Sequence, residues 1–165
     1  MQVNEQTFQG VRVRLTSAKP YAEALTSLLD DIGDVPIDLD QILKSQQSWD
    51  DCREYFNQVA GPSGFMLFGM LDHGAWMDKA GSFRRSIRII LGNPLIALTM
   101  LKHDLRAGLF APVELLLIEE EGDRSSLTYL KPSSLMVVEE NPPLLAAATV
   151  LDRKLEALAL KVAKS

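Results

Sequence analysis

The last part of the chain carries an apolar seam that must be covered by another layer of structure. Over about Pro142 to Lys164, apolar residues recur at intervals of four, three, four, three and four: Leu144, Ala148, Leu151, Leu155, Leu158 and Val162. This spacing places them on one face of a long helix, and Asn141 precedes its first turn as the expected N-cap. The seam is shorter than the three to four heptads typical of a coiled coil, so we expect the helix to pack across a sheet.

Alternation of apolar and polar residues predicts the strands of that sheet. Residues 11–15 alternate valine or leucine with arginine, and residues 84–91 place isoleucine and leucine on one face. Residues 113–119 and 126–130 have the pattern of a hairpin around the charged turn at 120–123. Residues 65–71 form an apolar run of strand length, although periodicity alone does not distinguish it from a helix.

Four further segments are predicted to be helical. Residues 20–32 have apolar residues at helical spacing, followed by a glycine at the expected C-terminus. Residues 34–62 have the pattern of a helical insertion with two start signals, Asp38 and Ser48, so one broken helix and two short helices both fit. A short helix is expected over 75–80. Another is expected over 95–102, and its almost continuous apolar sequence predicts that it is largely buried.

Composition indicates one ordinary domain and argues against several partners. With 165 residues, of which 47% are hydrophobic, the chain can bury a core without disulfides. Its formal net charge of −5 disfavours nucleic acid, and its apolar stretches fall short of the roughly 20 residues that span a bilayer. Residues 1–9 contain no apolar stretch that would suggest a secretory signal, and Cys52 is the single cysteine. We therefore expect a cytoplasmic protein that binds neither nucleic acid nor membrane.

Several motifs occur in an order that resembles one bacterial family. They are GNPLIA at 92–97, HDxRAGL at 103–109, Pro112, and the run from Tyr129 to Leu135 that ends in PSSL. They resemble the central pattern of the bacterial domain-of-unknown-function 302 family, and the resemblance covers most of residues 64–160. It implies an α+β fold in which a curved antiparallel sheet has helices packed on one side, commonly in a dimer. No activity follows from it.

These signals predict a single α+β domain. The expected order of elements is β-α-(helical insertion)-β-α-β-α-β-β-α, with the insertion at about 34–62 and a long C-terminal helix. A homodimer is the expected assembly.

Candidate ligand-binding residues gather in the expected loops: His73, Asn93, His103, Asp104, Arg106, Tyr129, Ser133 and Ser134. Arg106 lies on a tight Ala-Gly loop, and Asn93 opens a helix whose first N–H groups can meet an anion. The hydroxyls of Ser133 and Ser134 follow a strand, and no base is positioned beside them. Each of these residues also has a simpler structural role, as a helix cap, a turn residue or a member of a surface ion pair.

The two histidines raise a second chemical hypothesis. His73 and His103 each adjoin an aspartate, and imidazole with carboxylate can hold a metal ion or haem iron or relay a proton. Their separation matches no metal-binding motif, and a helix end and a turn are the simpler roles for them.

The arginines of two predicted strands raise a third chemical hypothesis, a patch that binds an anion. Arg12, Arg14, Arg84, Arg85 and Arg88 can form a cationic patch that binds a carboxylate or phosphate, or they can pair with Glu114 and residues 119–121 in a surface network. Pairing is the favoured interpretation.

Three functions are consistent with these patterns, and the patterns contain no known set of catalytic residues. The first is a homodimeric domain that binds a small molecule or acts as an accessory interaction module, using the concave side of the sheet and the loops of His73, Arg106 and Ser133. The second is a histidine-dependent metal or haem protein. The third is an assembly subunit whose C-terminal helix is the interface. The sequence identifies no cofactor and no reaction.

Overall fold

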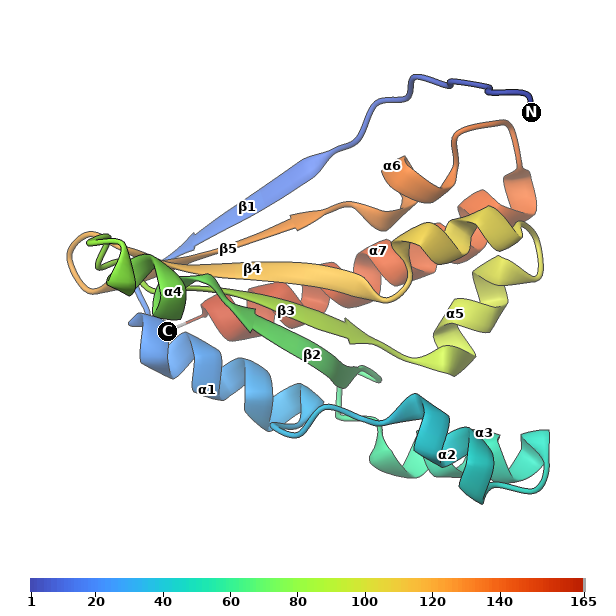
Figure 1. The fold of residues 1–165 in the computed structure, drawn as a ribbon, viewed down its shortest axis with the longest axis horizontal. Helices are drawn as coiled ribbons and strands as arrows, with labels where there is room; N and C mark the ends of the chain where they lie inside the picture. The colour runs from blue at the N-terminus through green and yellow to red at the C-terminus, as the bar shows by residue number, and fades with distance from the viewer. Residues whose placement is uncertain (165) are drawn as a thin grey trace.

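A five-stranded antiparallel sheet forms the centre of the computed structural model, which describes residues 1–164 (Figure 1). Its strands are β1 (Arg12–Ser17), β2 (Met66–Asp72), β3 (Ser86–Gly92), β4 (Val113–Glu120) and β5 (Arg124–Leu130). They lie in the order β1-β5-β4-β3-β2, so that β2 to β5 form a meander and β1 completes the sheet beside β5. The predicted α+β class and the hairpin at 113–130 are confirmed, and the apolar run predicted at 65–71 is a strand, observed over Met66–Asp72.

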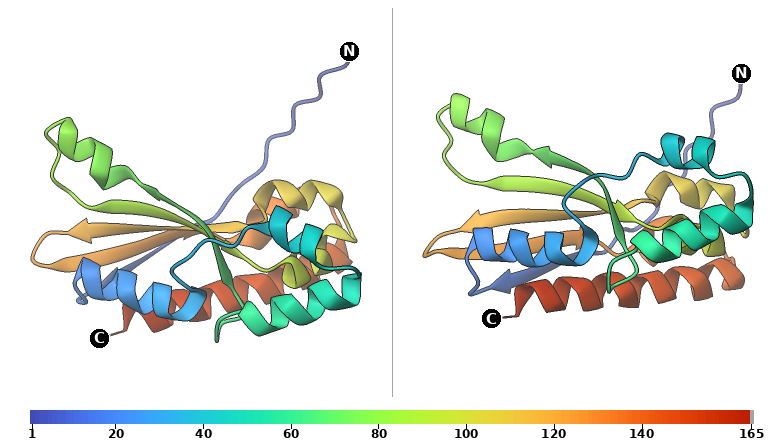
Figure 2. Two further views of the ribbon diagram at one scale, coloured as in Figure 1. Left: turned by 60° about the horizontal axis from the view of Figure 1, so that its bottom comes forward. Right: turned by 90° about the horizontal axis from the view of Figure 1, so that it is seen from below.

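Two long helices cover one face of this sheet. α1 (Tyr21–Ile32) and α7 (Pro142–Ala163) contact each other and lie on the same side of the strands (Figure 2). The seam of α7 is buried at all six predicted positions, against sheet residues such as Leu115, Leu117 and Leu127. Asn141 caps α7 as predicted, because its side chain accepts a hydrogen bond from the Leu144 amide at 3.1 Å.

The insertion consists of two helices. α2 (Leu39–Ser45) and α3 (Trp49–Val59) begin at the two predicted caps, where Asp38 accepts from the Gln41 amide and Ser48 from the Asp51 amide. A second small core joins them to β2, with Ile42, Cys52, Phe56 and Met66 as its buried members.

The helix after β3 differs from expectation. α5 (Pro94–Leu101) begins at Asn93 as predicted, yet Met100 is its one buried residue and Leu98 is 47% exposed. The prediction that this helix is largely buried is wrong, because α5 lies at the end of the sheet, where its main contacts are with α3, α7 and residues 105–110. Several of its apolar side chains border a hollow of about 270 Å³ beside α3, among them Ile96, Ala97, Leu98 and Leu101.

Three short helices complete the fold. α4 (His73–Lys79) overlaps the predicted helix at 75–80, whereas η1 (Leu105–Phe110, a 3-10 helix) and α6 (Pro132–Met136) were not predicted. Segments of five or six residues contain too few turns for a periodic pattern to form. Among residues 1–164, no helix combines the length and the apolar character that crossing a bilayer requires.

A buried carboxylate ties the insertion to the main core. Asp31 of α1 accepts hydrogen bonds from the Ser63 amide at 3.1 Å, from the Ser63 hydroxyl, and from Lys161 Nζ of α7 at 2.6 Å. Burial alone would raise the pKa of Asp31, but these hydrogen bonds outweigh it and hold the pKa below its usual value. The loop at 61–64 is thereby fixed between two helices.

Candidate functional site

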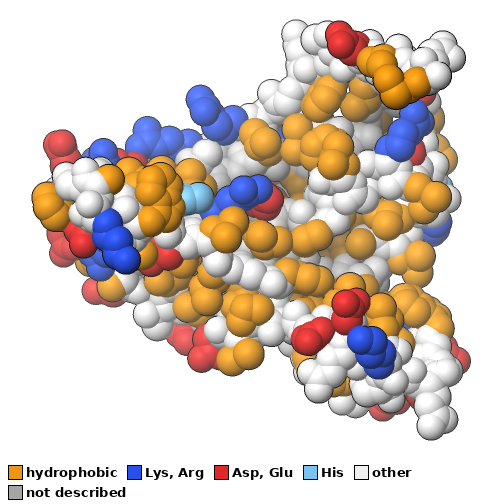
Figure 3. All heavy atoms as spheres, viewed as in Figure 1, with side chains coloured by type: hydrophobic (Ala, Val, Ile, Leu, Met, Phe, Trp, Pro, Cys, Tyr) orange, Lys and Arg blue, Asp and Glu red, His pale blue; other side chains and the backbone are white. Residues whose placement is uncertain are grey.

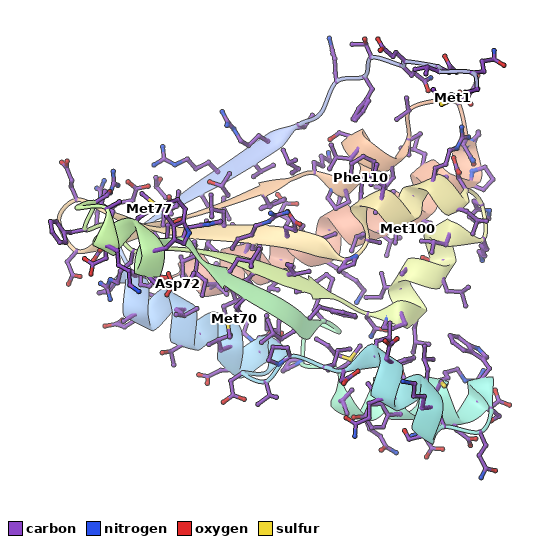
Figure 4. The ribbon with its side chains drawn as sticks, in the orientation of Figure 1. Met1, Met70, Asp72, Met77, Met100 and Phe110 are labelled. Atoms are coloured by element: carbon purple, nitrogen blue, oxygen red, sulfur yellow. The ribbon has the colours of Figure 1, made fainter. Side chains whose placement is uncertain are left out.

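The sheet face that points away from α1 and α7 is hollowed over its centre, with a volume of about 740 Å³ (Figure 3). Its floor consists of outward side chains from four strands: Arg12, Arg88, Glu114, Leu116, Thr128 and Leu130. Helix α4 forms one wall, while η1 and α6 form the opposite one; Figure 4 shows Met77 and Phe110 at these two sides. The hollow is therefore built from segments distributed over most of the chain.

Strand register explains which side chains reach the floor. Arg14, Thr128, Leu116 and Arg88 lie in one row across β1, β5, β4 and β3. Because successive side chains of a strand point to opposite faces, the neighbouring row of Val13, Tyr129, Leu115 and Ile89 faces the core. The hollow therefore lies mainly over the outward row, on the side of the sheet opposite the core.

Close packing of α4 on β3 places His73 in the hollow. Asp72 caps α4 by accepting a hydrogen bond from the Ala75 amide at 3.0 Å. A Cβ at position 74 would lie 3.0 Å from the Ser86 backbone nitrogen, so glycine there lets the helix lie directly against the strand. His73 meets Trp76 edge to face with ring centroids 6.2 Å apart, and Trp76 is 60% exposed. An aromatic wall thus stands beside the floor.

The arginines of the sheet are mostly paired with carboxylates. Arg88 donates from Nε to Glu114 at 2.8 Å, and Arg14 and Arg84 both contact Glu120. Arg85 forms a pair with Glu119, in which the hydrogen bonds from Arg85 hold the pKa of Glu119 below its usual value. The structure thus shows the surface network that the sequence favoured.

Arg12 differs from these arginines. It lines the hollow on β1, yet within residues 1–164 no carboxylate lies within ion-pairing distance of its guanidinium. The guanidinium of Arg12 therefore provides a positive charge, unpaired among these residues, at one side of the hollow.

The predicted site residues do not form one site. Arg106 and Asp104 border a smaller hollow of about 220 Å³ beside the N-terminal segment, where Phe8 meets Phe110 edge to face. Arg106 Nε donates to Asp104 at 3.0 Å, and this hydrogen bond is the main reason why the pKa of Asp104 lies below its usual value. Of the predicted site residues, His73 and Tyr129 line the larger hollow. Arg106 does not, although its helix η1 contributes Leu109 and Phe110 to the wall.

The serines after β5 make structural contacts. Ser133 donates from its amide and hydroxyl to Asp152 of α7 at 2.9 and 2.6 Å. Ser134 accepts from the Val11 amide and donates to the Lys131 carbonyl, which joins α6 to β1. Tyr129 points toward α7, where burial, followed by the charges of Glu156 and Asp152, raises its pKa. The PSSL motif is thus a junction between strand, helix and α7.

The two histidines are far apart in the fold. His73 begins α4 at one end of the sheet, whereas His103 follows α5 at the other end (Figure 1). Across the described residues, no three side chains among histidine, cysteine, aspartate and glutamate are grouped to hold a metal ion. A shared histidine centre therefore has no geometric support.

The side chain of Asn93 makes structural hydrogen bonds. It caps α5 and donates to the Gly64 carbonyl at 2.9 Å.

Several residues of the hollow were missed from the sequence. Trp76 and Leu109 are exposed on short helices, and Leu116 and Thr128 point outward from the central strands. Leu116 and Leu130 occupy positions where an outward-facing residue is ordinarily polar. Apolar residues at those outward positions were the available signal.

Comparison with known proteins gives a family and similar solved structures. The family model described as "Domain of unknown function DUF302" matches residues 41–162. The fold is similar to that of the crystal structure of an uncharacterized conserved protein DUF302 from Bacillus stearothermophilus. The two share 18% sequence identity with a TM-score of 0.64, over 92% of this chain and 97% of the other. No curated protein matches the sequence.

Proposed function

The chain belongs to the DUF302 family, a domain of unknown function, and from that premise we propose that it is a small-ligand-binding domain whose site is the hollow on the open sheet face. One observation carries the proposal: a hollow of about 740 Å³ whose lining is mostly apolar and includes three charged side chains, Arg12, Arg88 and Glu114. Ligand sites in proteins typically have volumes of roughly 300–1,000 Å³ and this mixture of side chains. An accessory role follows if the bound molecule belongs to a partner protein.

Exposed apolar side chains support this assignment. Leu109 is 82% exposed and Leu130 is 47% exposed, and both line the hollow together with Trp76. Each square ångström of apolar surface kept in water costs about 25 cal/mol, so a ligand that covers this surface gains free energy of binding. A contiguous patch of this kind is typical of a binding site.

A substitution on the floor tests the proposed site. Thr128→Trp is expected to weaken binding of the neutral compound 9-anthracenemethanol by at least about tenfold, because the indole fills the centre of the floor; a loss of tenfold corresponds to about 1.4 kcal/mol. Fluorescence anisotropy of the compound measures the dissociation constant. Thr16→Trp is the matched control, since Thr16 of β1 lies on the same face of the sheet as Thr128 but outside the hollow. Equal binding by wild type and Thr128→Trp, or no saturable binding by wild type, contradicts the proposal.

The proposal includes a homodimer. Its support is Leu105 of η1, whose side chain is 80% exposed and does not line the hollow. Light scattering should give twice the chain mass of 18.3 kDa, and Leu105→Lys should give the monomer, because a buried lysine would break the apolar contact. Leu145→Lys on the outer side of α7 is expected to remain a dimer, because the seam of α7 already packs on the sheet. A monomeric wild type refutes the homodimer, and a monomeric Leu145→Lys with a dimeric Leu105→Lys moves the interface to α7.

A cytoplasmic location is the remaining part of the proposal. It is supported by the buried thiol of Cys52, the one cysteine of the sequence, since such a chain needs no oxidising compartment to fold.

A further inference from the structure

We infer that the ligand of the hollow is an apolar molecule that carries one carboxylate, which Arg12 binds. The inference rests on the proposed function, because it assigns a chemical class to the ligand of that same site. It rests on a contrast between Arg12 and four other arginines. Arg14, Arg84, Arg85 and Arg88 all contact a glutamate, whereas within the described residues the guanidinium of Arg12 contacts none. Arg124, the first residue of β5, also lacks an ion pair among the described residues, but it does not line the hollow.

The position of Arg12 decides which part of the ligand it meets. Arg12 pairs with Leu130 in the register of β1 and β5, and Leu130 adjoins the apolar floor around Leu116. A carboxylate at Arg12 would therefore leave the rest of the molecule over leucine side chains. A guanidinium presents two parallel N–H donors that match the two oxygens of a carboxylate. One end of the hollow thus fits an anion and the remainder fits an apolar body.

The balance of charge in the hollow favours a single negative charge on the ligand. Its lining includes two arginines, Arg12 and Arg88, and one carboxylate, Glu114. The hydrogen-bonded pair of Arg88 and Glu114 cancels, which leaves one positive charge in a protein of net charge −5. A monoanion neutralises that charge, whereas a cation would meet Arg12 and a dianion would leave one charge unpaired on an apolar floor.

Two matched compounds and four proteins test the inference. The compounds are 9-anthracenecarboxylate and the neutral 9-anthracenemethanol, which have the same ring system. All proteins carry Trp49→Phe, because Trp49 borders the separate hollow beside α5 and its removal leaves Trp76 as the single fluorescent indole. Energy transfer from Trp76 to anthracene then reports binding near this indole, and its dependence on compound concentration gives the dissociation constant.

The expected results differ between neighbouring arginines. In the Trp49→Phe protein, the carboxylate should bind about tenfold more tightly than the alcohol, and Arg12→Gln should abolish this difference; a factor of ten corresponds to about 1.4 kcal/mol. Arg14→Gln is the matched control: it lies two residues away on the same face, contacts Glu120 and does not line the hollow, so the preference should persist. Glu114→Gln should strengthen carboxylate binding several-fold, because it releases Arg88 from its partner.

The outcomes separate the inference from the function on which it rests. Binding of both compounds with equal affinity, together with weaker binding by Thr128→Trp in the anisotropy measurement, overturns the carboxylate assignment and supports the hollow as a site. An equal loss in Arg12→Gln and Arg14→Gln also overturns the assignment, because it indicates a diffuse effect of surface charge. If neither compound transfers energy from Trp76 and anisotropy shows no saturable binding, both the assignment and the proposed function fail.

Discussion

Gly61→Ala is expected to lower the free energy of unfolding by more than about 3 kcal/mol, at the upper end for overpacked sites. A Cβ at position 61 would lie 1.5 Å from the carbonyl oxygen of Asp31, and that oxygen belongs to the backbone of α1. The loop has little freedom to yield, because the Gly61 amide donates to the Phe65 carbonyl at 2.9 Å and the Gly64 amide donates to the Gly61 carbonyl at 2.8 Å. Urea denaturation followed by circular dichroism measures the change.

Gly108→Ala is the matched control for this prediction. Its added Cβ would meet Leu101 at 3.7 Å, an ordinary van der Waals contact, so stability should change by less than about 1 kcal/mol. A Gly61→Ala protein as stable as Gly108→Ala would show that α1 and the loop do not approach each other in this way.

The second large effect is expected at the carboxylate beside this loop. Asp31→Asn should lower the free energy of unfolding by about 2 kcal/mol at pH 7, because it weakens hydrogen bonds that Ser63 and Lys161 make to a charged acceptor. The side chain of Asp31 is 1% exposed, so water cannot replace those partners. Asp30→Asn is the control, since Asp30 is the exposed neighbour on the same helix, and it should leave stability nearly unchanged.

The effect at Asp31 has a defined dependence on pH. The pKa of this carboxyl lies below its usual value of 3.8 in the folded protein, so the folded state binds the proton less readily than the unfolded chain. The stabilisation is complete above the unfolded pKa and is lost as pH falls through the folded one. The difference between wild type and Asp31→Asn should therefore shrink below about pH 4. A difference that stays constant from pH 7 to pH 3 would contradict the role assigned to the charge.

Elements with a strong local signal were predictable from the sequence. The seam of α7, the caps at Asp38, Ser48 and Asn141, and the alternation in β3 each depend on residues close together in the chain. Local rules of periodicity and capping decide such elements before tertiary contacts do. The burial of α5 could not be predicted in this way. Its sequence is apolar on every side, and what covers a helix depends on where it lies in the fold.

The candidate site was predictable only in part, because it depends on which strands become neighbours. His73 was identified from its motif, but the floor beneath it joins β1 to β5 and β4 to β3, and no local pattern in this sequence indicates those pairings. Ser133 illustrates the opposite error. Its hydroxyl looks available in the sequence, yet Asp152, a residue of a different helix, accepts its hydrogen bond. Polar loop residues can be assigned to a ligand only after their partners in the fold are known.

The strand order also determines the sequence of events in folding. The pairs β2–β3, β3–β4 and β4–β5 each join strands that are consecutive in the chain. In contrast, β1 pairs with β5, and Arg12 lies opposite Leu130. Closing so long a loop is entropically costly, and contacts between residues distant in sequence form slowly, so we expect β1 to be the last strand to dock. Because Arg12 belongs to β1, it takes its place in the hollow only when this strand docks. A molecule bound through Arg12 would therefore hold β1 against β5, and only a chain in which these two strands have paired could bind it in that way.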